Sequence, residues 1–100
     1  MSAEAAFIDS LRALATDPAA RGLLDDAAVL EVGGETLVLT HDTIVGGIHY
    51  FRTDPAEDVA WKLVGVTLSD LAAKGAEPVG ALLGFTLGEA AWDRAFVAGL

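Results

Sequence analysis

The stretch from Asp54 to Pro78, "DPAEDVAWKLVGVTLSDLAAKGAEP", constrains the fold more than any other part of the chain. Asp54 is expected to cap a helix that has Pro55 at its first position, and Glu57 completes an arrangement like a capping box. Gly75 should end this helix, with Pro78 beyond it. We therefore predict one long helix between Asp54 and Gly75.

One face of this predicted helix carries an apolar stripe of Val59, Leu63 and Val66, and Asp70 extends the stripe. The opposite face is apolar too, and a helix that is apolar on all sides is normally buried. We expect Asp70 to be sheltered, so that its carboxylate needs a metal, a base or backbone amides as a partner. A simpler alternative is that Asp70 pairs with Lys74 one turn on, or lies in water near the helix end.

The remaining elements follow from hydrophobic periodicity and turn residues. We predict a helix over Ala3–Ala15, strands over Ala27–Val32, Glu35–Thr43 and Val79–Leu87, and a helix from Ala90 onward. Gly33-Gly34 suits a tight hairpin turn, so the first two strands should be antiparallel. The order is αββαβα, which predicts an α+β fold of two layers with a mixed or antiparallel sheet.

Composition excludes several classes of function. The net charge of −9 repels nucleic acid and anionic membrane surfaces, so an anionic ligand would need a bridging cation. With no cysteine, the chain has no disulfide, thiolate zinc site or iron–sulfur cluster. The N-terminus lacks a basic region, and no apolar run approaches the roughly 18 residues that a membrane span needs. We therefore expect a cytoplasmic protein.

The stretch "LVLTHDTIVGGIHYF" places polar side chains where a strand ends. Strand alternation puts Thr40 and Asp42 on one face and His41 on the other. Asp25-Asp26 should lie across the hairpin from them, and with Asp70 four acidic side chains are expected to converge. Carboxylates with water and phosphate oxygens suit Mg²⁺, which predicts a shared metal–phosphate site. The alternative is that these aspartates are solvated surface residues of an acidic chain.

Other residues of the same stretch have several interpretations. His49 could donate to a phosphate, bind a metal or pack in the core, and His41 has the same options. Gly46-Gly47 favours a turn, because no Walker A, G-x-G-x-x-G or EF-hand pattern accompanies it. For Lys62 we expect an exposed charge, and for Trp61 a core aromatic.

Three segments, taken in order, resemble a known family. They are "LLDDAAVL", "LVLTHDTIVGGIHYF" and "PAEDVAWKLVGVTLSDLAAKGAEPVGALLGFTL". Together they resemble the N-terminal region of the thiamine-monophosphate kinase family, within the superfamily that includes aminoimidazole ribonucleotide synthetase. The motif "SDLAAKGAEP" is shared with some relatives, whereas "HDTIVGGIHYF" resembles a stretch particular to the kinases. The resemblance runs from about Leu24 to Leu87 and loosely through both flanking helices.

The resemblance implies transfer of the ATP γ-phosphoryl group to thiamine monophosphate, giving thiamine diphosphate, with several Mg²⁺ ions between protein and phosphates. Carried over by position, it implies Mg²⁺ ligands at Asp26, Thr40, Asp42 and Asp70, and a contact to thiamine monophosphate at His49. It also places a metal contact at His41, where the family usually has threonine, so the backbone carbonyl would be the ligand there. No covalent nucleophile is implied.

The resemblance also implies a larger assembly. We expect residues 1–100 to form a single N-terminal domain that binds ATP and Mg²⁺, with a second domain and further site residues beyond Leu100. The fragment alone should be inactive, and a homodimer should form through the N-terminal sheet. Two alternatives stay open: a non-catalytic module for cation binding or dimerisation, and an ATP-using relative with a different acceptor.

Overall fold

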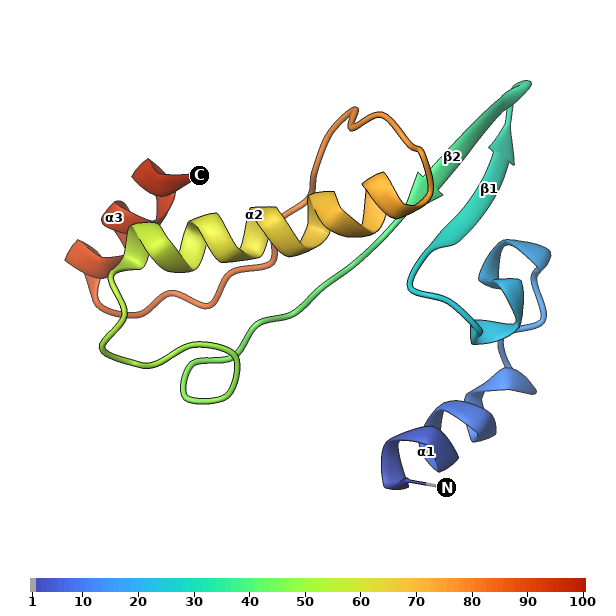
Figure 1. The fold of residues 1–100 in the computed structure, drawn as a ribbon, viewed down its shortest axis with the longest axis horizontal. Helices are drawn as coiled ribbons and strands as arrows, with labels where there is room; N and C mark the ends of the chain where they lie inside the picture. The colour runs from blue at the N-terminus through green and yellow to red at the C-terminus, as the bar shows by residue number, and fades with distance from the viewer. Residues whose placement is uncertain (1) are drawn as a thin grey trace. The chain divides into compact units, whose positions relative to one another are not determined.

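The structure, a computed structural model, describes residues 2–100. Its internal contacts divide the chain into two compact units, the first ending at His41 and the second beginning at Asp42. The first unit contains α1 (Ala3–Arg12), the 3₁₀ helix η1 (Pro18–Leu23), β1 (Ala28–Val32) and β2 (Glu35–Leu39). The second contains α2 (Ala56–Ala73) and α3 (Ala90–Gly99) (Figure 1).

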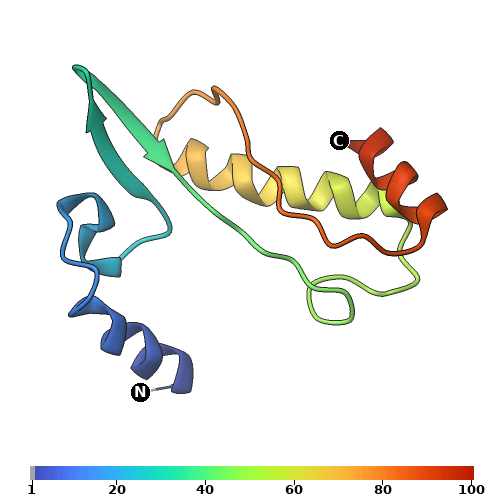
Figure 2. The same ribbon diagram turned by 180° about the vertical axis from the view of Figure 1, so that it is seen from behind.

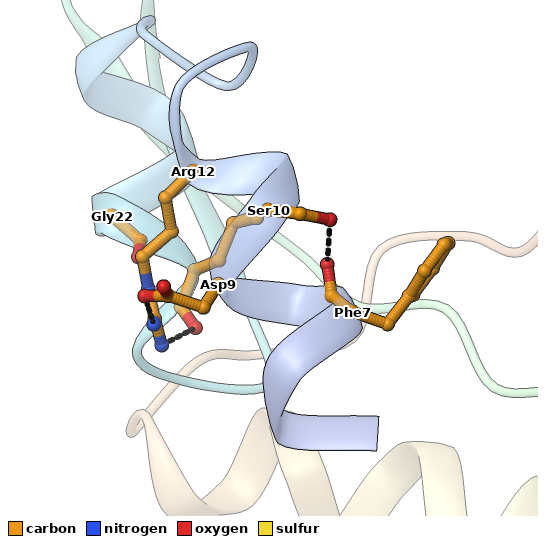
Figure 3. A network of polar contacts seen from close by, with 6 residues as sticks. Phe7, Asp9, Ser10, Arg12 and Gly22 are labelled. Carbon is orange, nitrogen blue, oxygen red and sulfur yellow. Dashed lines mark hydrogen bonds and ion pairs between the residues drawn. The ribbon is translucent and has the colours of Figure 1, made fainter. Parts of the chain in front are cut away.

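Helix α1 is held at both ends by side-chain hydrogen bonds. The Ser2 hydroxyl accepts from the Ala5 amide at 3.0 Å and caps the N-terminus. At the other end, Arg12 donates to the Asp9 carboxylate and to the Gly22 carbonyl, both at 2.9 Å (Figure 3). The bond to Gly22 ties α1 to η1. The helix ends at Arg12 and not at the predicted Ala15.

Strands β1 and β2 form the predicted antiparallel hairpin. Their register runs from Ala28 opposite Leu39 to Val32 opposite Glu35. Gly33 and Gly34 connect them with φ angles of 57° and 82°, a conformation that glycine adopts without steric cost. The second strand ends at Leu39 and not at Thr43, because β1 has no residue left to pair beyond Ala28.

Helix α2 confirms the long helix, although its start differs from the expected cap. Pro55 occupies the N-cap position and makes no side-chain cap. The Asp54 carboxylate accepts from the Phe51 amide at 2.8 Å instead, so the predicted capping box is wrong. Asp54 stabilises the preceding turn and is no longer available to the first amides of the helix. Gly75, with a φ of 65°, ends the helix as predicted.

The core of the second unit lies between the first turns of α2 and helix α3. Its buried residues are Ala56, Val59, Ala60 and Phe96. Figures 1 and 2 both show α3 against the N-terminal half of α2. Small residues permit this approach: a Cβ built at Gly99 would lie 2.8 Å from the Glu57 Cα and 3.1 Å from the Ala60 Cβ. The two helix backbones therefore pack almost in contact.

Much of the remaining apolar surface of α2 is exposed, which corrects the prediction of a helix buried on all sides. Trp61 is 79% exposed, so it is not the expected core aromatic, and Leu68 is 43% exposed. The reason is geometric. Helix α3 packs on the face of α2 that carries Val59 and Ala60, so Trp61 on another face stays uncovered, and the ten residues of α3 do not extend along all eighteen of α2.

The third strand, predicted over Val79–Leu87, is wrong for the residues that the structure describes. The segment is irregular and exposed, and it returns from the end of α2 to the start of α3 (Figure 2). A strand needs a partner edge for its backbone groups, and the hairpin is the one sheet within residues 2–100.

The α+β class is confirmed by the hairpin and the helices. Within the same residues, no helix combines the length and the apolar character needed to cross a membrane.

Two glycines in the second unit should respond to alanine in opposite directions. Gly99→Ala should destabilise by roughly 1–3 kcal/mol, because the methyl group forces the helices apart. Gly65→Ala, inside α2, should stabilise by up to about 1 kcal/mol, because no side chain and no other segment lies within 4 Å of the added carbon and alanine favours helix. Urea denaturation followed by tryptophan fluorescence measures both, and equal effects of the two substitutions would contradict this packing.

Candidate functional site

The open end of the hairpin brings two predicted ligands together. Beyond the last strand pair, the Thr40 hydroxyl donates to the Asp26 carbonyl oxygen at 3.1 Å. This bond holds the residue that precedes β1 beside the residue that follows β2. Asp26 is exposed and Thr40 is half-buried, so the first unit presents a carboxylate, a hydroxyl and a carbonyl oxygen at one place.

Asp25 has a different environment from its neighbour. One oxygen of its carboxylate accepts from the Ala27 amide at 2.9 Å, and the other lies 3.2 Å from the Arg21 Nε. Asp25 therefore stabilises the entry to β1 and pairs with Arg21, a residue of η1 that has a φ of 53°. Of the two adjacent aspartates, Asp26 is the one whose exposed carboxylate suits a ligand.

His41 and Asp42 occupy the junction between the units. His41 is the last residue of the first unit and is exposed, whereas Asp42 is the first residue of the second and is half-buried. Together with Thr40 they place three consecutive polar residues where the chain leaves the sheet.

His49 lies in a tight loop that fixes its imidazole. Its amide donates to the Val45 carbonyl at 2.9 Å, and its Nδ1 accepts from the Val45 amide at 2.8 Å. The Gly47 amide donates to the Tyr50 carbonyl at 2.7 Å, and Gly47 has a φ of 80°. Because Nδ1 is an acceptor, the proton of the neutral ring is on Nε2, which becomes a donor at the exposed edge of the side chain.

Lys62 of α2 anchors this loop. Its ammonium group donates to the His49 backbone carbonyl. We expected Lys62 to be an exposed charge with no specific partner, so this contact is a correction. The spacing of residues in the sequence could not reveal it, because the partner is a backbone carbonyl and not a side chain.

Asp70 lies near the C-terminal end of α2 and is half-buried, as is Leu71 beside it. Its carboxylate is therefore partly sheltered, as expected, although more of the α2 surface is exposed than predicted. Asp70 is the predicted ligand most distant in sequence from the hairpin, so only the tertiary fold could bring it to the other ligands.

The predicted ligands are divided between the two units. Asp26, Thr40 and His41 belong to the first, and Asp42, His49 and Asp70 belong to the second. Among residues 2–100, no three His, Asp or Glu side chains form a group that could hold a metal ion. The structure brings Asp26 and Thr40 together, and their convergence with Asp42 and Asp70 stays a prediction. The donors present are oxygen atoms, the type that Mg²⁺ prefers, so the residues fit this ion in kind.

Comparison with known proteins adds an independent finding. Residues 24–100 match the model of the family described as AIR synthase related protein, N-terminal domain. A thiamine-monophosphate kinase of Caulobacter vibrioides is 52% identical over 68 residues, which cover 67% of this chain and 19% of that protein. A thiamine-monophosphate kinase of Salmonella typhimurium is 38% identical over 95 residues, covering 92% of this chain and 29% of that protein.

A third relative, the thiamine-monophosphate kinase of Escherichia coli (strain K12), is 40% identical over 78 residues, or 75% of this chain and 24% of that protein. Comparison with solved structures gives no significant match. The chain thus spans less than a third of the length of these relatives. Since the family model covers most of the chain, the protein belongs to the family of AIR synthase related proteins, whose N-terminal domain it contains.

Proposed function

We propose that this chain is the N-terminal part of a kinase that transfers the γ-phosphoryl group of ATP to thiamine monophosphate and yields thiamine diphosphate. The observation that carries the proposal is the similarity to relatives named thiamine-monophosphate kinase, which extends over as much as 92% of the chain. Because the chain spans less than a third of those relatives, the activity is proposed for the protein that contains it.

In this proposal the carboxylates of Asp26, Asp42 and Asp70 and the hydroxyl of Thr40 hold Mg²⁺. His41 joins them through its backbone carbonyl. When bound, Mg²⁺ neutralises phosphate charge and aligns the phosphates for direct transfer. The hydrogen bond between Thr40 and the Asp26 carbonyl supports this assignment, because it holds the Thr40 hydroxyl beside the backbone of Asp26 before any ion arrives.

The charge of the chain also supports a metal-dependent phosphotransferase. With a net charge of −9, the chain repels polyphosphate unless divalent cations lie between the two. Phosphoryl transfer needs alignment and charge neutralisation more than it needs a covalent nucleophile. We therefore assign no residue of this chain as a nucleophile.

His49 is proposed to contact the phosphate of thiamine monophosphate. Its Nε2–H is the group that can donate, since the Val45 amide occupies Nδ1. Lys62 is a positioning residue for this contact. Its ammonium group holds the His49 carbonyl and does not occupy the imidazole, so the Nε2–H can face the substrate.

A homodimer in the cytoplasm completes the proposal. The exposed segment Val79–Leu87 includes large apolar side chains, such as Leu82 and Leu87, that lie in open solvent. Pairing of this segment with a strand edge of a second copy would satisfy its backbone groups.

Two rival functions are a non-catalytic cation-binding module and an ATP-using enzyme with another acceptor. The experiments below separate them from the kinase.

Binding of a non-hydrolysable ATP analogue should require Mg²⁺ and depend on the proposed ligands. Asp42→Asn and Asp70→Asn should each weaken the binding by at least about tenfold, which corresponds to roughly 1.4 kcal/mol, because each removes a charged ligand. Isothermal titration calorimetry measures the affinity with and without Mg²⁺. Asp9→Asn is the matched control, since Asp9 pairs with Arg12 at an exposed position of α1. Binding without Mg²⁺, or unchanged binding in both variants, would favour the non-catalytic module.

Lys62→Met should raise the KM for thiamine monophosphate by about threefold to tenfold and leave the KM for ATP unchanged. The reason is that the loop loses its anchor while His49 itself is retained. Steady-state kinetics of the complete protein measures both constants, and amide exchange of the Val45–Tyr50 loop should become faster in the same variant. Arg94→Met removes an exposed cation of α3 as a control. A rise in both KM values, or protected loop amides, would contradict the positioning role.

A further inference from the structure

Residues Arg21–Leu23, at the end of η1, form a left-handed turn. The φ angles are 53° at Arg21, 67° at Gly22 and 54° at Leu23. Glycine adopts this conformation freely, whereas other residues bring their Cβ atom too close to the following carbonyl oxygen, so Arg21 and Leu23 are strained. Such strain persists only where the surrounding structure imposes it, and it is concentrated at functional positions. Contacts from outside the turn must therefore hold it in this form.

The guanidinium group of Arg12, in α1, supplies these contacts. Its Nε donates to the Gly22 carbonyl at 2.9 Å (Figure 3), and one of its terminal nitrogens donates to the Leu23 carbonyl at 3.5 Å. Arginine can make both contacts at once because its donors form a rigid planar fork. The ion pair of Arg12 with Asp9 is exposed, and such pairs contribute little, so the two carbonyl contacts are the ones that hold the left-handed turn.

The left-handed turn leads directly to the predicted metal ligand Asp26. The Arg21 Nε lies 3.2 Å from one oxygen of the Asp25 carboxylate, and the other oxygen accepts from the amide of the buried Ala27 at 2.9 Å. On the other side, the Thr40 hydroxyl donates to the Asp26 carbonyl at 3.1 Å. The backbone of Asp26 is therefore held from both sides, while its carboxylate stays exposed.

We propose that Arg12 and the left-handed turn position the Asp26 carboxylate for a divalent cation, so that Arg12 is a positioning residue of the metal site without contacting the ion. A ligand whose backbone is fixed in advance loses less conformational freedom when the ion binds, and the affinity for the ion is higher for that reason. Residues that orient a metal ligand commonly change the affinity by about tenfold or more when they are removed. The inference rests on the proposed function in that Asp26 is taken as a ligand of the ion.

A merely structural role is the alternative, in which Arg12 joins α1 to η1 and the hairpin alone sets the position of Asp26. The two accounts differ in the effect of added strain. If the left-handed turn positions Asp26, strain added at Gly22 must weaken the metal site, whereas the same kind of strain added at Gly33, in the hairpin turn, must not.

Gly22→Ala adds this strain without removing a hydrogen bond. The new methyl group has room, since the nearest atoms belong to the Leu24 side chain at 3.7 Å, but it lies on a backbone with a φ of 67°. Gly33→Ala is the matched control, because its φ is 57° and no atom beyond its two chain neighbours lies within 4 Å of the added carbon. Both variants should lower the thermal midpoint by a similar amount, which circular dichroism measures.

Titration calorimetry of the complete protein with Mn²⁺, in the presence of a non-hydrolysable ATP analogue, measures the affinity of the metal site. Gly22→Ala and Arg12→Met should each weaken Mn²⁺ binding about tenfold, and Gly33→Ala should leave it unchanged. Asp9→Asn retains both carbonyl contacts of Arg12 and should also leave it unchanged. Equal Mn²⁺ affinities in Gly22→Ala and Gly33→Ala would overturn the proposal.

Hydrogen exchange gives a second measurement that needs no metal. The amides of Leu24 and Ala27, which directly follow the left-handed turn and Asp26, are both hydrogen-bonded. Their exchange should become faster in Gly22→Ala and in Arg12→Met and stay unchanged in Gly33→Ala. Exchange that is equally fast in all three variants would show a general loss of stability and would contradict the positioning role.

An assay of thiamine monophosphate phosphorylation by the complete protein separates this proposal from the proposed function. Unchanged Mn²⁺ affinity in Gly22→Ala, in a protein whose wild type is active, would refute the positioning role and leave the kinase intact. Weaker Mn²⁺ binding in Gly22→Ala, in a protein whose wild type does not phosphorylate thiamine monophosphate, would support the positioning role and refute the kinase alone.

Discussion

The close contact between α3 and the first turns of α2 is the interaction on which the second unit depends. Ala56, Ala60 and Gly99 are small enough to let the two backbones meet, and Phe96 fills the remaining space. Ile44, Tyr50 and Trp92 pack against the same cluster, so the loop with His49 is tied to the core and not merely to its neighbours in sequence. One small core thus supports both the loop and the stacked rings of Tyr50 and Trp92.

Local signals in the sequence predicted the helices and the hairpin, because caps, turns and periodicity act over a few residues. Gly33, Gly34 and Gly75 all have positive φ angles and end their elements as expected. The failures have non-local causes. Asp54 was expected to cap α2, but a nearby amide competes for its carboxylate. The exposure of Trp61 depends on what covers α2, and periodicity carries no information on that point.

In the candidate site, too, local features were predicted correctly and contacts between distant segments were not. Counting residues on both sides of the hairpin turn predicted that Asp25-Asp26 would lie across from the end of the second strand, and the hydrogen bond from Thr40 to the Asp26 carbonyl confirms this pairing. The same count could not separate Asp25 from Asp26, since the difference arises from Arg21 and from a backbone amide. The contact of Lys62 with the His49 carbonyl and the stacking of Tyr50 on Trp92 escaped prediction, because both join segments that no motif spacing links.

The central claim is that carboxylates distant in sequence share bound divalent ions. NMR with Mn²⁺ in place of Mg²⁺ tests it most directly, because a paramagnetic ion broadens the signals of nuclei close to it. With a nucleotide analogue present, the account predicts that substoichiometric Mn²⁺ broadens the amide signals of Asp26, Thr40, Asp42 and Asp70 together and spares those of Glu31 and Glu35 near the hairpin turn. Broadening spread over the acidic surface, or confined to one of the four, would contradict it.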